Sequence, residues 1–271
     1  MEQYLWLVPL GFVIGAYGTL IGAGGGFVLV PLLLLAYPSA SADTITSISL
    51  AVVFFNALSG SIAYARARRI DYYSGGLFAL AAVPGAVLGA LTTAFIPRRF
   101  FDILIGVLMV GAALFLFWRP AGDNSARRPK PGEFMRCVVE ADGTEHVFYY
   151  NRPLGIGLSL IVGYLSSLLG IGGGFIHVPV LVGLLNFPVH IATATSHFVL
   201  SIMALAGTLT HIMTGAFQHG GVRRTIMLSF GVVLGAQLGA YLSSRVQGDW
   251  IIHGLALALA LVGLRLLWSA I

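Results

Sequence analysis

Two glycine-rich phrases contain the residues of this chain best suited to hold a charged solute. GAGGGFVLVP fills residues 22–31 and GIGGGFIHVP fills residues 170–179, each inside a long apolar stretch. Consecutive glycines weaken a helix and proline removes a backbone donor, so we expect the first helix to stop near Gly22 and resume between Phe27 and Pro31. The same is expected in the second phrase.

Such a break has a chemical consequence. It leaves main-chain amides without helical partners, and the resuming helix adds the positive end of its dipole, so the two together attract an anion. Eight glycines are therefore expected to bind a substrate: Gly22, Gly24, Gly25, Gly26, Gly170, Gly172, Gly173 and Gly174.

Polar side chains follow each phrase on the next apolar segment. Their hydroxyl, amide and imidazole groups can donate hydrogen bonds to an anion, although Ser and Thr are also ordinary packing residues between membrane helices. Histidine titrates near neutral pH, so His177 and His197 could also carry a proton, and a satisfied interior role stays open for both. The candidate binding residues are Thr46, Ser47, Asn56, Thr195, Ser196 and His197.

Residue types that are absent from the apolar segments argue against several other functions. None of the ten acidic residues falls in the middle of a segment, whereas cation pumps and proton relays usually keep a carboxylate there. His197 and His211 would lie about 21 Å apart on one helix, so they predict no metal site. GxSxG and P-loop patterns are absent, so we expect neither an enzyme nor an ATP-driven pump, and no cofactor.

Composition places these residues in a bilayer. The 271-residue chain is 58% hydrophobic and 9% charged, against about 25% charged in soluble domains. Its apolar runs match the roughly 20 residues that a helix needs to cross a membrane. MEQYLWLVPL has no basic leader, so we read it as a retained first segment. The scattered basic residues behind the net charge of +5 suit membrane orientation rather than nucleic-acid binding.

The chain also repeats itself. An internal repeat of this kind is common in transporter folds. We expect an all-α integral membrane protein of two homologous repeats, with about 4+4 transmembrane helices and the first helix of each repeat broken at its glycines. The expected regions are a first repeat at 1–118, a hydrophilic linker at 119–152 and a second repeat at 153–271. The matching landmarks are residues 22–31 with 170–179, Thr46-Ser47 with Thr195-Ser196, GAVLGA at 85–90 with GAQLGA at 235–240, and Trp118 with Trp268.

Orientation follows from basic residues in short loops. Arg66, Arg68 and Arg69 follow the second segment, and Arg223 and Arg224 fill the corresponding loop of the second half. We therefore expect both loops to be cytoplasmic, with the halves pointing the same way and the linker and C-terminus also cytoplasmic. Five crossings per half in inverted orientation is the rival arrangement. In the linker, FMRCVVE and EHVFYY around ADGT indicate a small β-hairpin or a flexible tether.

The chain resembles the sulfite exporter TauE/SafE family. The resemblance rests on GAGGGFVLVP and GIGGGFIHVP, each followed by a TS-containing helix (TSISL, ATSHF), and on the duplicated layout outside residues 119–152. It implies a permease in a bacterial inner membrane for small sulfur-containing or organic anions such as sulfite, sulfonates or sulfoacetate. The alternative is a membrane anchor or assembly subunit that acts through the linker. Expected partners are the anion and the lipid bilayer, with a homo-oligomer left open.

Overall fold

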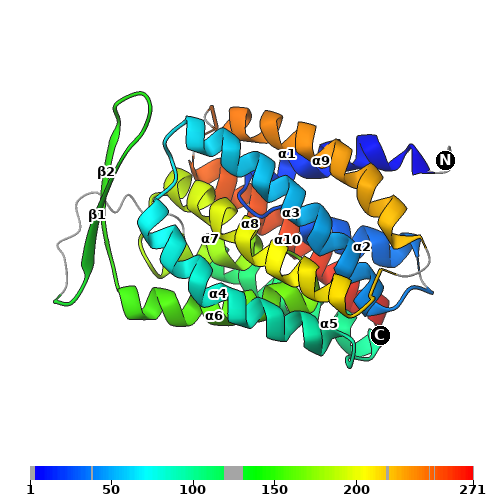
Figure 1. Cartoon of the computed structure of the whole chain (residues 1–271). Coiled ribbons are helices and arrows are strands. Elements are labelled where there is room, and N and C mark those ends of the chain that lie inside the picture. Colours follow the sequence, from blue (N-terminus) through cyan, green and yellow to red (C-terminus); the bar gives the residue numbers. More distant parts are fainter. Residues whose placement is uncertain are drawn as a thin grey trace.

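The computed structural model describes residues 4–37, 39–118, 131–217, 220–243, 245–246 and 248–270. This part of the chain is a bundle of helices with a two-stranded hairpin at one end (Figure 1). The elements are α1 (Leu7–Leu20), α2 (Gly26–Ala36), α3 (Ala42–Arg66), α4 (Tyr72–Thr93), α5 (Arg98–Trp118), β1 (Phe134–Val139), β2 (Glu145–Tyr150), α6 (Arg152–Leu169), α7 (Gly174–Gly183), α8 (Val189–Met213), α9 (Gly221–Ser243) and α10 (Gly248–Ala270).

Length and composition place this bundle in a membrane. Within the described residues, α3, α4, α6, α8 and α9 are each long and apolar enough to cross a bilayer. The 25 residues of α3 would span about 37 Å, against a hydrocarbon core of about 30 Å. The prediction of an all-α integral membrane protein is confirmed.

Both glycine phrases interrupt their helices. α1 ends at Leu20 and α2 begins at Gly26, while α6 ends at Leu169 and α7 begins at Gly174. Gly22, Gly24 and Gly25 have φ values of 77°, 74° and 78°, a left-handed conformation that reverses the chain and that suits glycine. The predicted breaks are therefore present.

The prolines do not mark the end of either break. Pro31 and Pro179 lie inside α2 and α7, and α2 begins at Gly26, one residue before the expected range of Phe27 to Pro31. Each helix resumes at the last glycine of its phrase. Proline is tolerated there because membrane helices satisfy the freed backbone group through neighbouring groups and local adjustments.

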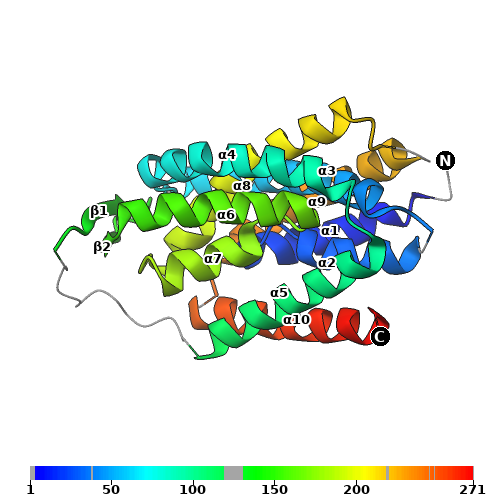
Figure 2. The same ribbon diagram turned by 90° about the horizontal axis from the view of Figure 1, so that it is seen from below.

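Each broken helix turns back on itself instead of continuing across. The start of α1 packs beside the start of α9 through Gly11 and Leu228, and the end of α2 returns to the same level, where Tyr37 stacks on Arg224. α6 and α7 form the same kind of hairpin from the opposite end, because Gly155 near the start of α6 lies close to Leu185 just beyond α7 (Figure 2).

The two halves consequently point in opposite directions. The β-hairpin lies at one end of the bundle, here called the hairpin end, and the end of α10 lies at the other, here called the terminal end, with the start of α1 (Figure 1). The expectation that the linker and the C-terminus share one side of the membrane is wrong. The arginine loops show why: Arg69 sits at the hairpin end beside Glu140, whereas Arg224 sits at the terminal end beside Tyr37.

Glycine stripes hold the outer helix pairs together. A β-carbon on Gly85 or Gly89 would overlap the backbone of α6, and one on Gly235 or Gly239 would overlap the backbone of α1. These residues therefore serve close packing, which is the role that their GxxxG spacing predicts. The pairs α4 with α6 and α1 with α9 join the two halves of the chain along their length.

The β-hairpin is fixed to the bundle. Its strands pair antiparallel, with Phe134 opposite Tyr150 and Val139 opposite Glu145. Phe148 and Tyr150 are buried against Phe187, which precedes α8. The hairpin therefore lies on the second half of the chain as well as beside the loop that joins α3 and α4.

Candidate functional site

The two interrupted segments meet at the centre of the bundle. We call residues 21–25 the first glycine loop and residues 170–173 the second glycine loop. A β-carbon on Gly26 would overlap the carbonyl oxygen of Ile171, and one on Gly174 would lie 2.7 Å from the α-carbon of Ala23. The helices that begin at Gly26 and Gly174 therefore start side by side and run to opposite ends, so both positive dipole ends lie in the middle.

Several amides in these loops have no hydrogen-bond partner among the described residues. The amides of Ala23 and Gly24 donate to the carbonyl of Gly18, which closes the end of α1. No acceptor is found for the amides of Gly25, Gly26 and Phe27, nor for those of residues 171–175. A buried amide without a partner costs about 1–3 kcal/mol, so these groups are available to donate hydrogen bonds to a solute.

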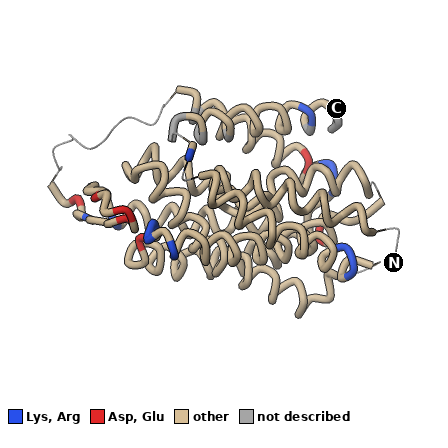
Figure 3. Tube along the Cα trace, turned by 90° about the horizontal axis from the view of Figure 1, so that it is seen from above, with Lys and Arg blue, Asp and Glu red and all other residues tan. Residues whose placement is uncertain are grey.

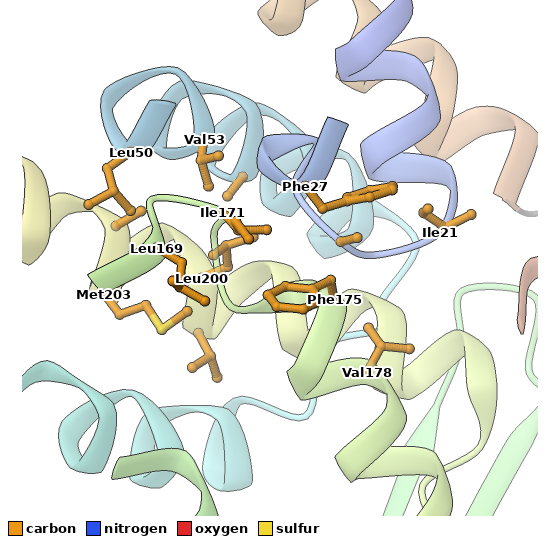
Figure 4. Close-up of a cluster of buried hydrophobic side chains, with 14 of the residues drawn as sticks. Ile21, Phe27, Leu50, Val53, Leu169, Ile171, Phe175, Val178, Leu200 and Met203 are labelled. Atoms are coloured by element: carbon orange, nitrogen blue, oxygen red, sulfur yellow. The ribbon is translucent and has the colours of Figure 1, made fainter. Parts of the chain in front are cut away.

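Aliphatic side chains cover the two loops. Val53 of α3 and Leu200 of α8 are fully buried. A β-carbon on Gly172 would lie 2.6 Å from Val53 Cγ1, and one on Gly24 would overlap Leu200. Figure 4 shows these side chains beside Ile171, Phe27 and Phe175. The centre of the bundle is thus closed by apolar groups in this conformation.

A hydrogen-bonded network lies beside the first glycine loop, and we call it the Thr19 network. Thr19 Oγ1 of α1 donates to Asn56 Oδ1 of α3 at 3.2 Å and lies 3.3 Å from His197 Nε2 of α8. The Tyr64 hydroxyl donates to the Thr19 carbonyl at 2.7 Å. A β-carbon on Gly60 would lie 2.7 Å from His197 Cδ2, so the imidazole fits only because residue 60 has no side chain.

The predicted polar residues do not converge on one point. Asn56 and His197 belong to the Thr19 network, and Ser196 lies beside His197 in sequence with its hydroxyl buried and unpartnered. Thr46 and Ser47 lie on the opposite side of the centre, because the α-carbon of Thr46 packs against Gly170. The predicted list therefore divides between the two glycine loops.

The hydroxyls of three of the predicted residues are hydrogen-bonded to the protein backbone. The hydroxyls of Thr46 and Ser47 donate to carbonyls of their own helix, those of Asp43 and Thr44. Thr195 Oγ1 accepts from the amide of Asp71 at 3.0 Å, which ties α8 to the start of α4. These contacts match the packing role that the sequence left open for such residues.

His177 is separate from His197. It lies on α7 with Nε2 3.5 Å from Ser159 Oγ and its ring edge-on to Phe78. It is 1% exposed, like the Thr19 network, yet it contacts α4 and α6 instead of α1 and α3. The two histidines therefore cannot act as one pair.

Three residues near the loops were missed from the sequence. Thr19 bridges the network, and Ser166 and Ser167 are buried near the second glycine loop with hydroxyls that have no partner among the described residues. A signal for two of them was present. Thr19 precedes Gly22 by three residues and Ser167 precedes Gly170 by three, so a hydroxyl occupies the same place in both halves.

Charge is concentrated away from this centre. Figure 3 shows the described Lys, Arg, Asp and Glu residues gathered toward the two ends of the bundle. At the hairpin end Arg136 forms a bidentate pair with Asp71 at 2.7 Å, and Asp71 is fully buried at its side chain. No group of three or more His, Cys, Asp or Glu residues suited to a metal ion occurs in the described ranges.

The hairpin end has a second ion-pair cluster. Glu140 accepts from Arg69 Nε at 2.6 Å and contacts His146 Nε2 at 2.9 Å. Burial alone would raise the pKa of Glu140, but the hydrogen bonds and charges of His146 and Arg69 lower it below its usual value. The hairpin is therefore held by its own charged residues.

Two broken helices that meet at the middle of a multi-pass bundle, with their N-termini turned inward, are typical of membrane transporters. The comparisons agree with this class. Residues 7–266 match the family model described as "Sulfite exporter TauE/SafE", and the chain belongs to this family.

Curated relatives match over nearly the whole chain. It is 30% identical over 275 residues to the "Probable membrane transporter protein YunE" of Bacillus subtilis, covering 99% of each chain. It is 24% identical over 284 residues to a "Probable membrane transporter protein" of Methanocaldococcus jannaschii, covering 98% of this chain and 97% of the relative. No solved structure matches. The protein is a multi-pass membrane transporter.

Proposed function

We propose that the protein carries small sulfur-containing or organic anions, such as sulfite, sulfonates or sulfoacetate, across a bacterial inner membrane. The observation that supports this most directly is the pairing of the two glycine loops. The starts of α2 and α7 and the unpartnered amides of Gly25, Gly26 and residues 171–175 all lie at one place. Amides and helix N-termini favour negative charge.

The surroundings of the loops support an anion over a cation. The described acidic side chains lie toward the ends of the bundle, and Asp71 is already paired with Arg136. A cation arriving at the centre would meet N–H donors and aliphatic side chains and no carboxylate. An oxyanion would instead accept hydrogen bonds from the amides and from the hydroxyls of Ser166 and Ser167.

The closed centre requires a conformational step. Val53 and Leu200 cover both loops, so a solute can reach the amides only after these side chains or their helices move. Inverted repeats supply a natural motion, because the two halves can exchange conformations about the fixed central site. We assign this structure to the occluded stage of such a cycle.

The orientation of the bundle follows from its basic residues. Among the described residues, six arginines lie at the hairpin end and five toward the terminal end, so the hairpin end is the more basic one and we assign it to the cytoplasm. The described basic residues are Arg66, Arg68, Arg69, Arg136, Arg152 and Arg245 at the hairpin end, and Arg98, Arg99, Arg223, Arg224 and Arg265 toward the terminal end.

A flux assay with purified protein in lipid vesicles tests the proposal. Sulfite, methanesulfonate, sulfoacetate, sulfate and acetate are each presented outside, with potassium as the cation control. We expect saturable uptake of at least one sulfur oxyanion, roughly tenfold above empty vesicles, and no potassium uptake. Uptake of none of the anions by correctly inserted protein would refute the proposed function.

A further inference from the structure

The Thr19 network joins the two halves of the chain. Thr19 lies on α1 directly before the first glycine loop, Asn56 lies on α3, and His197 comes from α8 in the other half. All three side chains are fully buried. Any motion that separates α1 from α8 must therefore break this network.

In and beside the network, some hydrogen-bond donors have no acceptor among the described residues. A hydroxyl has one proton, so Thr19, which donates to Asn56 Oδ1, accepts from His197 Nε2–H. Asn56 Nδ2 then has no partner, and neither has the hydroxyl of Ser196. Unsatisfied amide and hydroxyl groups at this depth are costly, and polar groups retained inside a membrane bundle mark function.

Charge balance is the central difficulty for an anion in this place. Arg69 is the described basic residue that lies close enough to act on the network, through Tyr64, but its Nε is already paired with Glu140. The other described basic residues lie toward the ends (Figure 3). An unpaired ion buried in a low-dielectric interior costs several kcal/mol. Helix termini supply only about half a unit charge each. A proton on the imidazole of His197 supplies a full positive charge.

The other titratable groups around His197 are few. Tyr64 of α3 presents its ring edge at a centroid distance of 5.5 Å, and its hydroxyl is already donated to Thr19. From the α3–α4 connection, Arg69 is paired with Glu140, and Asp71 is paired with Arg136. α1 contributes only the Thr19 hydroxyl. A tyrosine, with an ordinary pKa near 10, stays neutral, so His197 is the group among these whose imidazole can accept a proton when an anion binds beside it.

We propose, resting on the proposed anion transport, that His197 takes up one proton from solution as the anion binds and releases it when the anion leaves. The proton adds to Nδ1, while Nε2–H keeps its bond to Thr19. Asn56 Nδ2 donates to an oxygen of the anion. No covalent bond of the anion forms or breaks. The protein therefore moves an anion and a proton together, and Thr19 and Asn56 act as positioning and binding residues.

Calorimetry on the unmodified protein tests the proton directly. The probe is methanesulfonate, which stays ionised over the working range, titrated at pH 7.5 in buffers of different ionisation enthalpy. The dependence of the observed heat on the buffer gives the number of protons taken up per anion, and we expect about one. Binding of methanesulfonate with no proton uptake would overturn the proposal and leave anion transport intact.

Variants then locate the proton. His197→Gln keeps an N–H that can reach Thr19 but cannot titrate, and His177→Gln is the matched control on α7. In vesicles that contain a pH dye, an anion gradient should drive proton movement in the wild type and in His177→Gln. In His197→Gln we expect the anion-driven proton movement to fall at least tenfold. The anion flux that remains should be independent of pH. Full proton movement in a monodisperse His197→Gln protein contradicts the assignment.

Asn56 has a test of its own. Asn56→Asp is close in size and replaces the free amide with a carboxylate, so methanesulfonate binding should fall at least tenfold. Asn56→Gln retains the amide and should bind the anion more tightly than Asn56→Asp. Equal binding by both variants would remove Asn56 from the site. Absence of binding by the wild type to every anion of the panel would instead count against the proposed function itself.

Discussion

The main chain at Gly26 lies so close to the carbonyl oxygen of Ile171 that residue 26 has no room for a β-carbon. Gly174 meets Gly22 and Ala23 in the same way from the other half. The glycines at these two positions are therefore required by contact between the loops, whatever binds there. The lack of side chains at these positions allows the loops to pack together, and it also leaves the backbone amides accessible to a solute.

This contact makes a prediction about single methyl groups. Gly26→Ala and Gly174→Ala should each destabilise the protein by about 1–3 kcal/mol, because an added group in a closed core forces the backbone apart. The matched control is Gly157→Ala on α6, where a β-carbon meets nothing within 4 Å. Thermal unfolding followed by size-exclusion chromatography measures the difference. Equal melting of all three variants would show that the loops do not pack as described.

The pair between Arg136 and Asp71 predicts a rescue. Arg136→Gln leaves the fully buried Asp71 carboxylate without its charged partner, with only the hydrogen bonds from Ser74, which should cost about 3–5 kcal/mol at the hairpin. Adding Asp71→Asn removes the charge and should recover much of the loss. Hydrogen exchange of the β1 and β2 amides reports on docking of the hairpin. If the double variant exchanges as fast as Arg136→Gln, the pair does not hold the hairpin.

Glu140 predicts a dependence of hairpin docking on pH. Its pKa is lower in the folded protein than in the unfolded chain, so its contribution is fully present above the unfolded value of about 4.3 and is lost as pH falls through the folded value. Exchange protection of the hairpin, corrected for intrinsic rates, should therefore drop below about pH 4. Glu140→Gln should show weak protection that does not change over this range, and a parallel drop in that variant would point to another group.

The orientation can be measured with the single native cysteine. Cys137 lies exposed on β1 at the hairpin end, so it should react with a membrane-impermeant maleimide only after cells are opened. A variant with Cys137→Ser and Phe95→Cys moves the thiol to an exposed site at the terminal end. That variant should react in intact cells. The reverse pattern would invert the assigned orientation.

Much of the architecture could be predicted from local sequence. Three consecutive glycines after an apolar run specify a break, and the GxxxG spacing of Gly85 and Gly89 specifies close packing, because both effects depend on residues near in the chain. The direction of the chain after the break could not be predicted. It depends on positive φ values at Gly22, Gly24 and Gly25 and on packing against the other half. The same glycines in the sequence would be equally compatible with a kinked helix that continues in its original direction.

The orientation error has a similar origin. Arg66 to Arg69 and Arg223 to Arg224 look alike in sequence, and the rule for basic loops treats each loop by itself. Once each broken helix returns to its starting end, the number of full crossings per half becomes odd, and similar loops fall on opposite sides. Thr19 was missed for another reason: its place three residues before Gly22, which Ser167 shares before Gly170, is a weak signal, because a lone hydroxyl on an apolar helix usually serves packing.

The β-hairpin makes the proposed transport cycle asymmetric. Two inverted halves by themselves would make the inward-open and outward-open states nearly equal in free energy, since each is the other turned over. The strap formed by β1 and β2 joins the α3–α4 connection to Phe187 at one face only, and it has no equivalent at the opposite face among the described residues. To open at that face, the protein must first separate the β-hairpin from the bundle. We therefore expect the transporter without substrate to be open mainly at the opposite face of the membrane.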